Sequence, residues 1–163
     1  MKPGIIILAA GESARMGTPK QLLAYRGSTL LRRTIGIAGP VAAPPVTVVL
    51  GAHAALIREE LEGVDAPLLL TDKSDWQDGM GGSLRTGLNA LLTVHPNLPA
   101  ALFPVCDQPL LKTANLTNLI TVPEANGHAI AAADYDGILG VPAVFDRSLF
   151  PELLRSSGAE GAR

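Results

Sequence analysis

The chain alternates short apolar runs with segments of helical periodicity, and this alternation limits it to a small set of folds. The first run, Ile5–Ala10, contains no polar residue, as expected of a strand that is buried on both faces. Apolar residues then recur at helical spacing, at Leu30, Leu31, Ile35 and Ala38. A strand followed by a helix is the repeating unit of α/β proteins.

The same alternation continues to the end of the sequence. We expect further strands at 46–50, after the Pro44-Pro45 break, and at 68–71, 100–106, 129–133 and 141–145, and helices around 56–61, 84–92, 116–120 and 148–154. The strand at 141–145 follows turn residues at Asp136-Gly137 and Gly140, which favour an antiparallel strand. The sequence therefore predicts an α/β fold with three layers, in which a Rossmann-like, mostly parallel sheet carries helices on both faces. We expect residues 1–163 to form a single domain.

Composition limits the partners. Thirteen basic and fifteen acidic side chains give a net charge of −2, which provides no broad basic surface for nucleic acid or anionic lipid. The single cysteine, Cys106, cannot form an internal disulfide, and we expect it to be buried rather than reactive. No apolar run approaches the length of a membrane span. We expect a cytoplasmic protein with no nucleic-acid or membrane partner.

The segment LAAGESARMGTPKQLL, residues 8–23, predicts a phosphate-binding loop. Small residues and glycines follow the first strand directly, so backbone N–H groups can approach phosphate oxygens, and Arg15 and Lys20 can neutralise them. The spacing fits neither the Walker A motif nor G-x-G-x-x-G. On composition alone, a glycine-rich turn with two solvated cations remains the alternative.

Polar residues at the ends of later strands are further candidates. Asp107 follows the strand at 100–106, where a carboxylate can bind Mg²⁺ at the ligand-binding edge of the sheet or can instead form a turn or helix cap. Ser83, in the GMGGSL segment that we expect to precede a helix, can line a ligand cleft or cap that helix. Gly51, at the end of the second strand, can approach a base, whereas we expect His53 to start a helix.

These motifs resemble those of the MobA-like group of molybdenum cofactor nucleotidyltransferases, which is related to the sugar-phosphate nucleotidyltransferases. The first motif carries the resemblance as LAAGxSxRMGxPKxLL. It is extended by WQDGMGGSLRTGL at 76–88, CDQP at 106–109, and GVPAVF followed by SLFPELL. Within the group, the sequence is most similar to the molybdenum cofactor cytidylyltransferase branch.

The resemblance implies a nucleotide site and a reaction. Lys20 and Arg15 would be the catalytic residues that meet the phosphates, with Lys20 stabilising charge as pyrophosphate leaves. Asp107 would hold Mg²⁺. The backbone of the first strand end would hold the base and ribose, and the full nucleotide-binding set would be Leu8, Ala9, Ala10, Gly11, Arg15, Lys20, Gly51 and Ser83.

The implied reaction transfers CMP from CTP to molybdopterin and releases pyrophosphate, after which the product could pass to a molybdoenzyme or its chaperone. CTP is favoured by Ala10, where the guanylyl branch tends to carry glycine, and by the GMGGSL segment. The same chemistry with GTP or with a sugar phosphate is the enzymatic alternative, and a nucleotide-binding protein without catalysis is the other. A dinucleotide oxidoreductase is disfavoured because G-x-G-x-x-G is absent.

The sequence also departs from the family pattern. Ala159 stands where the family commonly has aspartate, and the sequence ends at Arg163, before a strand with a DIDTP-like motif. We therefore expect the C-terminal strand and helix of the family, with a second metal-binding aspartate, to be lacking.

Overall fold

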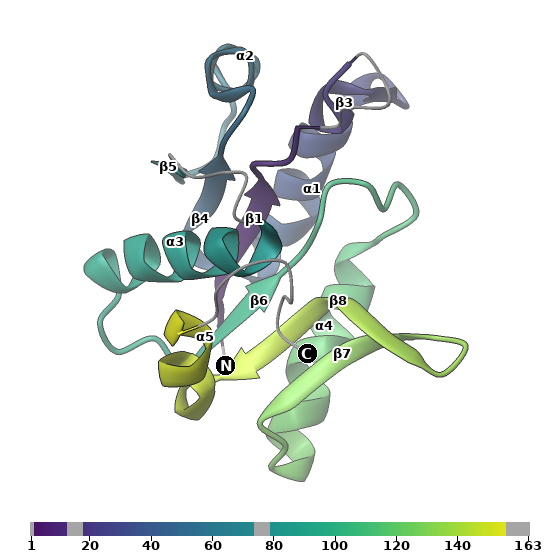
Figure 1. Cartoon of the computed structure of the whole chain (residues 1–163). Helices are drawn as coiled ribbons and strands as arrows, with labels where there is room; N and C mark the ends of the chain where they lie inside the picture. Colours follow the sequence, from purple (N-terminus) through teal and green to yellow (C-terminus); the bar gives the residue numbers. More distant parts are fainter. Residues whose placement is uncertain (1, 13–17, 74–78, 156–163) are drawn as a thin grey trace.

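A six-stranded sheet forms the centre of the computed structural model, which describes residues 2–12, 18–73 and 79–155 (Figure 1). The strand order is β5-β4-β1-β6-β8-β7. The first four of these strands run parallel, whereas β8 is antiparallel to both β6 and β7. The strands are β1 Gly4–Ala9, β4 Ala43–Leu50, β5 Leu68–Asp72, β6 Ala100–Phe103, β7 Ile130–Tyr135 and β8 Ile138–Asp146. The predicted mostly parallel sheet is confirmed, as is the antiparallel strand that includes 141–145.

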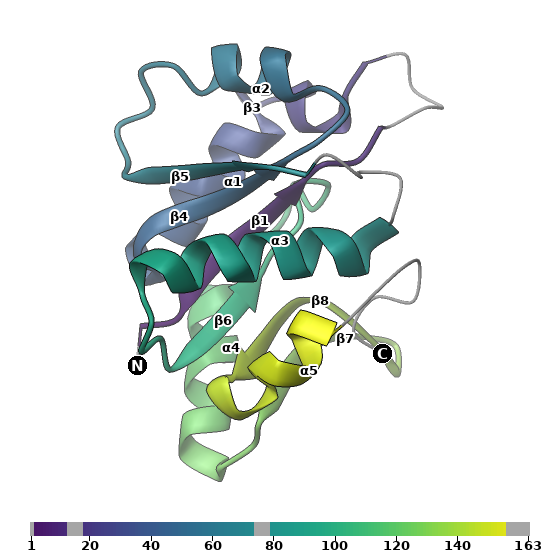
Figure 2. The ribbon, with the colours of Figure 1, turned by 60° about the vertical axis from the view of Figure 1, so that its left-hand side comes forward.

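Helices cover both faces of the sheet and complete the predicted three layers (Figures 1 and 2). The helices α1 Leu30–Ala38, α2 Ala54–Glu60 and α4 Thr113–Asn126 contribute buried side chains to one core. The other core takes its helical side chains from α3 Gly79–Val94 and α5 Phe150–Arg155. The described residues also form a small hairpin of β2 Ala24–Tyr25 and β3 Ser28–Thr29. Single-turn 3₁₀ helices lie at Lys20–Leu22, Gly39–Val41 and Arg147–Leu149.

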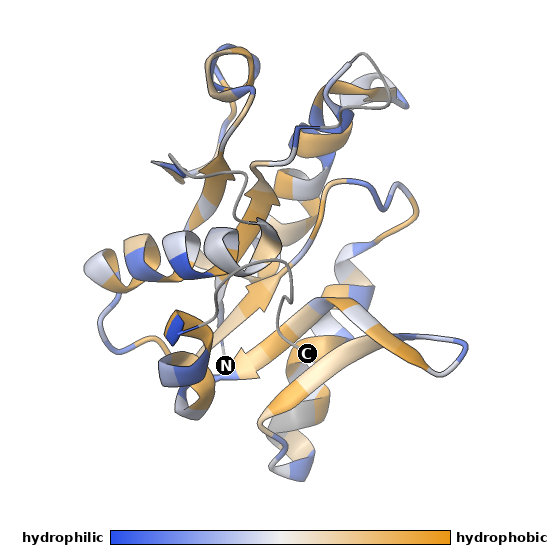
Figure 3. Ribbon diagram, viewed as in Figure 1, coloured by the Kyte–Doolittle hydropathy of each residue, from blue (hydrophilic) through white to orange (hydrophobic). Residues whose placement is uncertain are grey.

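The sequence of β1 is apolar throughout because the strand is buried on both faces. Ile5 and Ile7 belong to the core under α1 and α4, whereas Ile6 belongs to the core under α3, and none of the three is exposed. The central strands are accordingly mostly apolar (Figure 3). A Cβ at Gly87 of α3 would lie 2.3 Å from Cγ2 of Ile6, so the glycine allows α3 to pack directly onto the sheet.

Several element boundaries differ from the prediction, and those of three strands have a clear physical basis. The strand predicted at 46–50 begins at Ala43 and includes both prolines. The strand predicted at 100–106 ends at Phe103, because Pro104 has no N–H for the ladder, and only an isolated bridge joins Val105 to Leu8. Gly140 lies inside β8 rather than in the turn, which is formed by Asp136 and Gly137 with positive φ angles.

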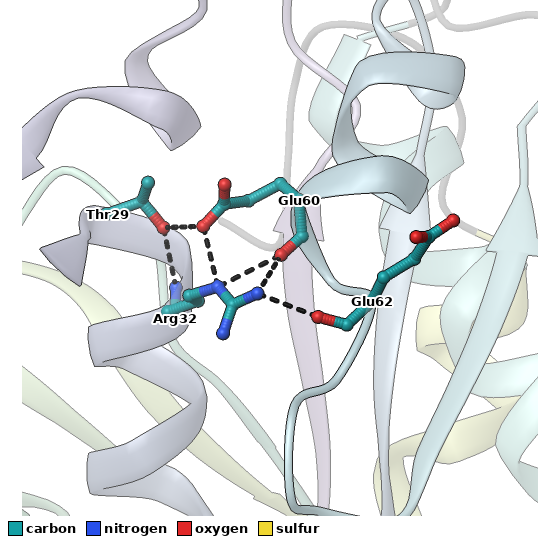
Figure 4. A network of polar contacts seen from close by, with 4 residues as sticks. All are labelled: Thr29, Arg32, Glu60 and Glu62. Carbon is teal, nitrogen blue, oxygen red and sulfur yellow. Dashed lines mark hydrogen bonds and ion pairs between the residues drawn. The ribbon is translucent and has the colours of Figure 1, made fainter.

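A polar network joins the start of α1 to the end of α2 (Figure 4). The Arg32 guanidinium donates to the backbone carbonyls of Glu60 and Glu62 and to the Glu60 carboxylate. The Thr29 hydroxyl caps α1 by accepting from the Arg32 amide and donates to the same carboxylate. Arg32 thus satisfies carbonyls that the end of a helix leaves without partners.

Within the described ranges, no helix combines the length and the apolar character that crossing a membrane requires.

Candidate active site

A pocket of about 320 Å³ lies where β1 and β6 end and α3 begins. Its walls come from the last residues of β1, the 3₁₀ helix at Lys20–Leu22, the first turns of α3 and the segment after β6. Carboxyl ends of parallel strands are the usual location of ligands in open α/β sheets. The pocket therefore lies at the edge that the sequence predicts for ligand binding.

Two opposite charges meet in this pocket. Lys20, at the start of the 3₁₀ helix, and Asp107, which follows β6, both line it, with Nζ 3.5 Å from Oδ2. Their side chains are 46% and 51% exposed, so solvent screening leaves little net energy in the ion pair itself. Both groups can therefore exchange partners when a charged ligand enters the pocket.

Of the four nucleotide-binding residues predicted at the end of β1, three line the pocket. Leu8, Ala10 and Gly11 line the pocket, whereas Ala9 is part of the core under α1. Gly51 is not among the lining residues, because it packs directly against Ala10. A Cβ at Gly51 would lie 2.4 Å from the Ala10 carbonyl oxygen, so a glycine there permits the close approach of β4 and β1.

Ser83 lines the pocket from inside a helix rather than from its cap. The GMGGSL segment was expected to precede the helix, but α3 already begins at Gly79. Ser83 is 6% exposed, and its hydroxyl donates to the Gly79 carbonyl at 3.5 Å. The apolar periodicity that placed the helix start near Leu84 does not extend to the first five residues of α3, of which three are glycine.

Lys73 is a buried lysine beside the same helix start, and the sequence analysis missed it. It follows β5, is 6% exposed, and donates from Nζ to the Gly79 carbonyl at 2.8 Å. A lone lysine after an apolar strand carries no sequence signal that separates it from a solvated one.

Gln21 is the second residue that the sequence analysis missed. It lies directly after Lys20, is 5% exposed, and lines the pocket. Its Nε2 donates to the carbonyls of Ala9 at 2.9 Å and Gly11 at 3.3 Å. The side chain thus holds the backbone on both sides of Ala10.

The sequence analysis also makes predictions for His53, Cys106 and Arg15. His53 occupies the N-cap position of α2, as expected, and its Nε2 lies 2.8 Å from the Glu12 carbonyl oxygen. Cys106 is buried, also as expected. Burial, and then the charge of Asp107, raises the pKa of its thiol to about 12, which keeps it protonated and unreactive. Arg15 lies outside the described residues.

The pocket fits a divalent cation that is shared with a polyphosphate. Among the described residues, no group of three or more His, Cys, Asp or Glu side chains could hold a metal. Asp107 presents one half-exposed carboxylate at the pocket. Mg²⁺ is commonly bound by one or two carboxylates together with substrate phosphates and water, and Asp107 fits that role.

A second hollow, of about 810 Å³, lies between α4 and the β7 edge. Its lining is mainly aliphatic, and among the described residues that line it Asp134 is the charged one, with no Lys or Arg. A polyphosphate would meet no cation there, so the pocket at Lys20 is the better candidate for a nucleotide.

Comparison with known proteins decides the family. The profile of the MobA-like NTP transferase domain matches residues 5–163. The chain belongs to this family. Among curated relatives, nicotine blue oxidoreductase of Paenarthrobacter nicotinovorans is 35% identical over 171 residues, which cover 97% of this chain and 78% of that protein. Bifunctional protein GlmU of Thermobifida fusca is 31% identical over 129 residues, which cover 77% of this chain and only 26% of the relative.

Solved structures support the same family fold. Rv0371c of Mycobacterium tuberculosis superposes with a TM-score of 0.80 at 31% identity, over 99% of this chain and 80% of that one. A second crystal structure of Rv0371c, in complex with manganese, gives a TM-score of 0.73 at 29% identity, over 97% and 78% of the two chains. The α/β three-layer fold is thus shared with Rv0371c, and one of the two crystal structures of that protein is a complex with manganese.

Proposed function

We propose that this chain is a nucleotidyltransferase that transfers a nucleoside monophosphate from a nucleoside triphosphate to a phosphorylated acceptor. The observation that carries the proposal is the meeting of Lys20 and Asp107, at 3.5 Å, in the pocket at the carboxyl ends of β1 and β6. An ammonium group and a metal-binding carboxylate are the two charges that phosphoryl-transfer chemistry needs beside a triphosphate.

In the proposed reaction, an oxygen of the acceptor phosphate attacks the α-phosphorus, and the bond to the β-phosphate oxygen breaks. Lys20 stabilises the negative charge that develops as pyrophosphate departs, with Arg15 as the second predicted cation. Asp107 would hold Mg²⁺, which when bound neutralises phosphate charge and aligns the triphosphate. The residues need not supply a general base, because a phosphate monoester is largely ionised near neutral pH.

We further propose CTP as the nucleotide and molybdopterin as the acceptor. Support comes from the resemblance to the cytidylyltransferase branch in LAAG and GMGGSL, and from the position of those segments: Ala10 and Ser83 both line the pocket. In this proposal the product is a cytidine dinucleotide form of the cofactor, for delivery to a molybdoenzyme or its chaperone.

The test compares four nucleotides and then measures transfer. Thermal shifts of the protein with Mg²⁺ and each of CTP, GTP, UTP and ATP identify the ligand, and pyrophosphate release in the presence of molybdopterin tests the reaction. We expect CTP to raise the Tm most and to support pyrophosphate release. GTP-selective stabilisation contradicts the choice of base, and binding without pyrophosphate release indicates a nucleotide-binding protein without catalysis.

Two alternatives can be distinguished by the same assays. A sugar phosphate is the alternative acceptor, and pyrophosphate release with a sugar phosphate but not with molybdopterin would support it. The name of the nicotine blue oxidoreductase relative points to redox chemistry on nicotine blue. Redox conversion of nicotine blue by this protein, without any pyrophosphate release, would support that activity instead.

A further inference from the structure

The amide of Gln21 is oriented by its own hydrogen bonds. Its Nε2 donates to the carbonyl oxygens of Ala9 and Gly11, which bracket Ala10 at the end of β1. An amide nitrogen can donate two hydrogen bonds and accepts none, so this assignment is the one in which both carbonyls are satisfied. The amide oxygen Oε1 therefore points away from these carbonyls.

That oxygen is buried without a partner. Among the described residues, Gln21 Oε1 receives no hydrogen bond, although the side chain is 5% exposed and belongs to the lining of the pocket. A buried acceptor that stays unpaired is costly, and native proteins rarely retain one unless water, an ion or a ligand satisfies it. Gln21 directly follows Lys20 and lines the proposed nucleotide site.

The chemistry of an acceptor restricts what can satisfy it. Phosphate oxygens are acceptors when ionised, so the triphosphate cannot bond to Oε1. The nucleoside can, because a base carries amino N–H groups and the ribose carries hydroxyls.

We propose that Gln21 recognises the nucleoside part of the substrate: its Oε1 accepts a hydrogen bond from a base amino group or a ribose hydroxyl, while its Nε2 fixes the strand end against which the nucleoside lies. This inference rests on the proposed nucleotidyltransferase function and adds a specificity-determining residue to it.

The test pairs one protein substitution with removal of one donor from the ligand. Dissociation constants are measured for wild type and Gln21→Met with CTP, with UTP, which lacks the base amino group, and with 2′-deoxy-CTP, which lacks one hydroxyl. If GTP is the ligand, ITP and 2′-deoxy-GTP replace them. We expect one analogue to bind wild type about three- to ten-fold more weakly than the parent nucleotide, and to bind Gln21→Met as well as the parent does. The analogue that binds wild type more weakly than the parent nucleotide, but binds Gln21→Met equally well, lacks the group that donates to Oε1.

The control removes a buried unpaired oxygen elsewhere. The Thr47 hydroxyl in β4 is fully buried and has no partner among the described residues, and Thr47 does not line the pocket. Thr47→Val should keep the wild-type ratios of all three ligands. Gln21→Glu, which keeps an acceptor but places a second oxygen against the Ala9 and Gly11 carbonyls, should weaken every ligand and lower the Tm.

Two outcomes overturn the inference. Equal ligand ratios in wild type and Gln21→Met, with both proteins folded by circular dichroism, show that the nucleoside does not use Oε1 and leave the proposed function intact. A wild-type protein that binds none of the nucleotides overturns the inference together with the proposed function.

Discussion

Lys20 Nζ lies 3.5 Å from Asp107 Oδ2, so the ends of β1 and β6 bring a cation and a carboxylate together across one pocket. Each side chain keeps about half of its surface exposed. At this distance the two charges offset each other. A triphosphate with its metal brings a partner of opposite sign for each of them, which is the exchange that the proposed function requires.

Replacing Asp107 with Asn should remove the metal-dependent part of nucleotide binding. The amide keeps the shape of the side chain but loses the charge that a divalent cation needs. We expect the Mn²⁺ affinity of the nucleotide-bound protein to fall at least ten-fold, as measured by the free Mn²⁺ signal in electron paramagnetic resonance. Asp134→Asn, in the second hollow, is the control and should bind Mn²⁺ like wild type.

Gly51 should be intolerant of a methyl group. A Cβ at this position would lie 2.4 Å from the Ala10 carbonyl oxygen and 2.8 Å from its Cα, so Gly51→Ala must displace the strand end that lines the pocket. We expect nucleotide affinity measured by calorimetry to fall about ten-fold. Gly36→Ala is the matched control, because a Cβ at Gly36 meets nothing within 4 Å and the residue lies inside α1. Wild-type affinity in Gly51→Ala would show that the strand end does not contact the nucleotide.

The Arg32 network should contribute to stability rather than to catalysis. Arg32→Ala loses hydrogen bonds to the carbonyls of Glu60 and Glu62 and to the Glu60 carboxylate (Figure 4). We expect the free energy of unfolding in urea to fall by about 1–3 kcal/mol. Arg58→Ala, which breaks an exposed pair with Asp72, should cost under about 1 kcal/mol. Equal losses in the two variants would mean that the carbonyl contacts of Arg32 add nothing.

The pattern of apolar runs was sufficient to predict the three layers of the fold but not the exact boundaries of the strands. β1 was predictable because each of its residues faces a core, which leaves no position for a polar side chain. The start of β4 was not, because prolines normally interrupt a strand. Here Ala43 pairs with Gly4, whereas pairing with β5 begins only at Val46 with Leu68, so the prolines occupy a stretch that has a neighbour on one side alone.

The sequence predicted which candidate residues lie at one edge of the sheet, but not which side chains form hydrogen bonds there. Lys20 and Asp107 follow strands that are adjacent and parallel, so the strand order places both at the same edge of the sheet. Gln21 and Lys73 form hydrogen bonds to backbone carbonyls that only the folded chain brings within reach. Glutamine and lysine are most often surface residues, so the residue types alone did not indicate these buried contacts.

The thiol of Cys106 should make stability depend on alkaline pH. Because burial raises its folded pKa to about 12, the folded state retains a proton that the unfolded chain loses from about pH 9. The stabilisation is therefore complete below pH 9 and is lost as pH rises towards 12, by about 1.4 kcal/mol per pH unit. Urea unfolding at pH 8 and pH 10 should show a larger loss for wild type than for Cys106→Ala. Equal losses, or rapid labelling of the native thiol at pH 8, would contradict the burial of this thiol.

The most direct test of the proposed chemistry is the rate of pyrophosphate release at saturating CTP and molybdopterin with Mg²⁺, compared between wild type and Lys20→Ala. If Lys20 stabilises the charge on the departing pyrophosphate, kcat should fall at least 100-fold. Lys112→Ala removes an exposed lysine that does not line the pocket, and it should keep the wild-type rate. A Lys20→Ala protein that is folded and retains the wild-type kcat would contradict the role of Lys20 in the transfer.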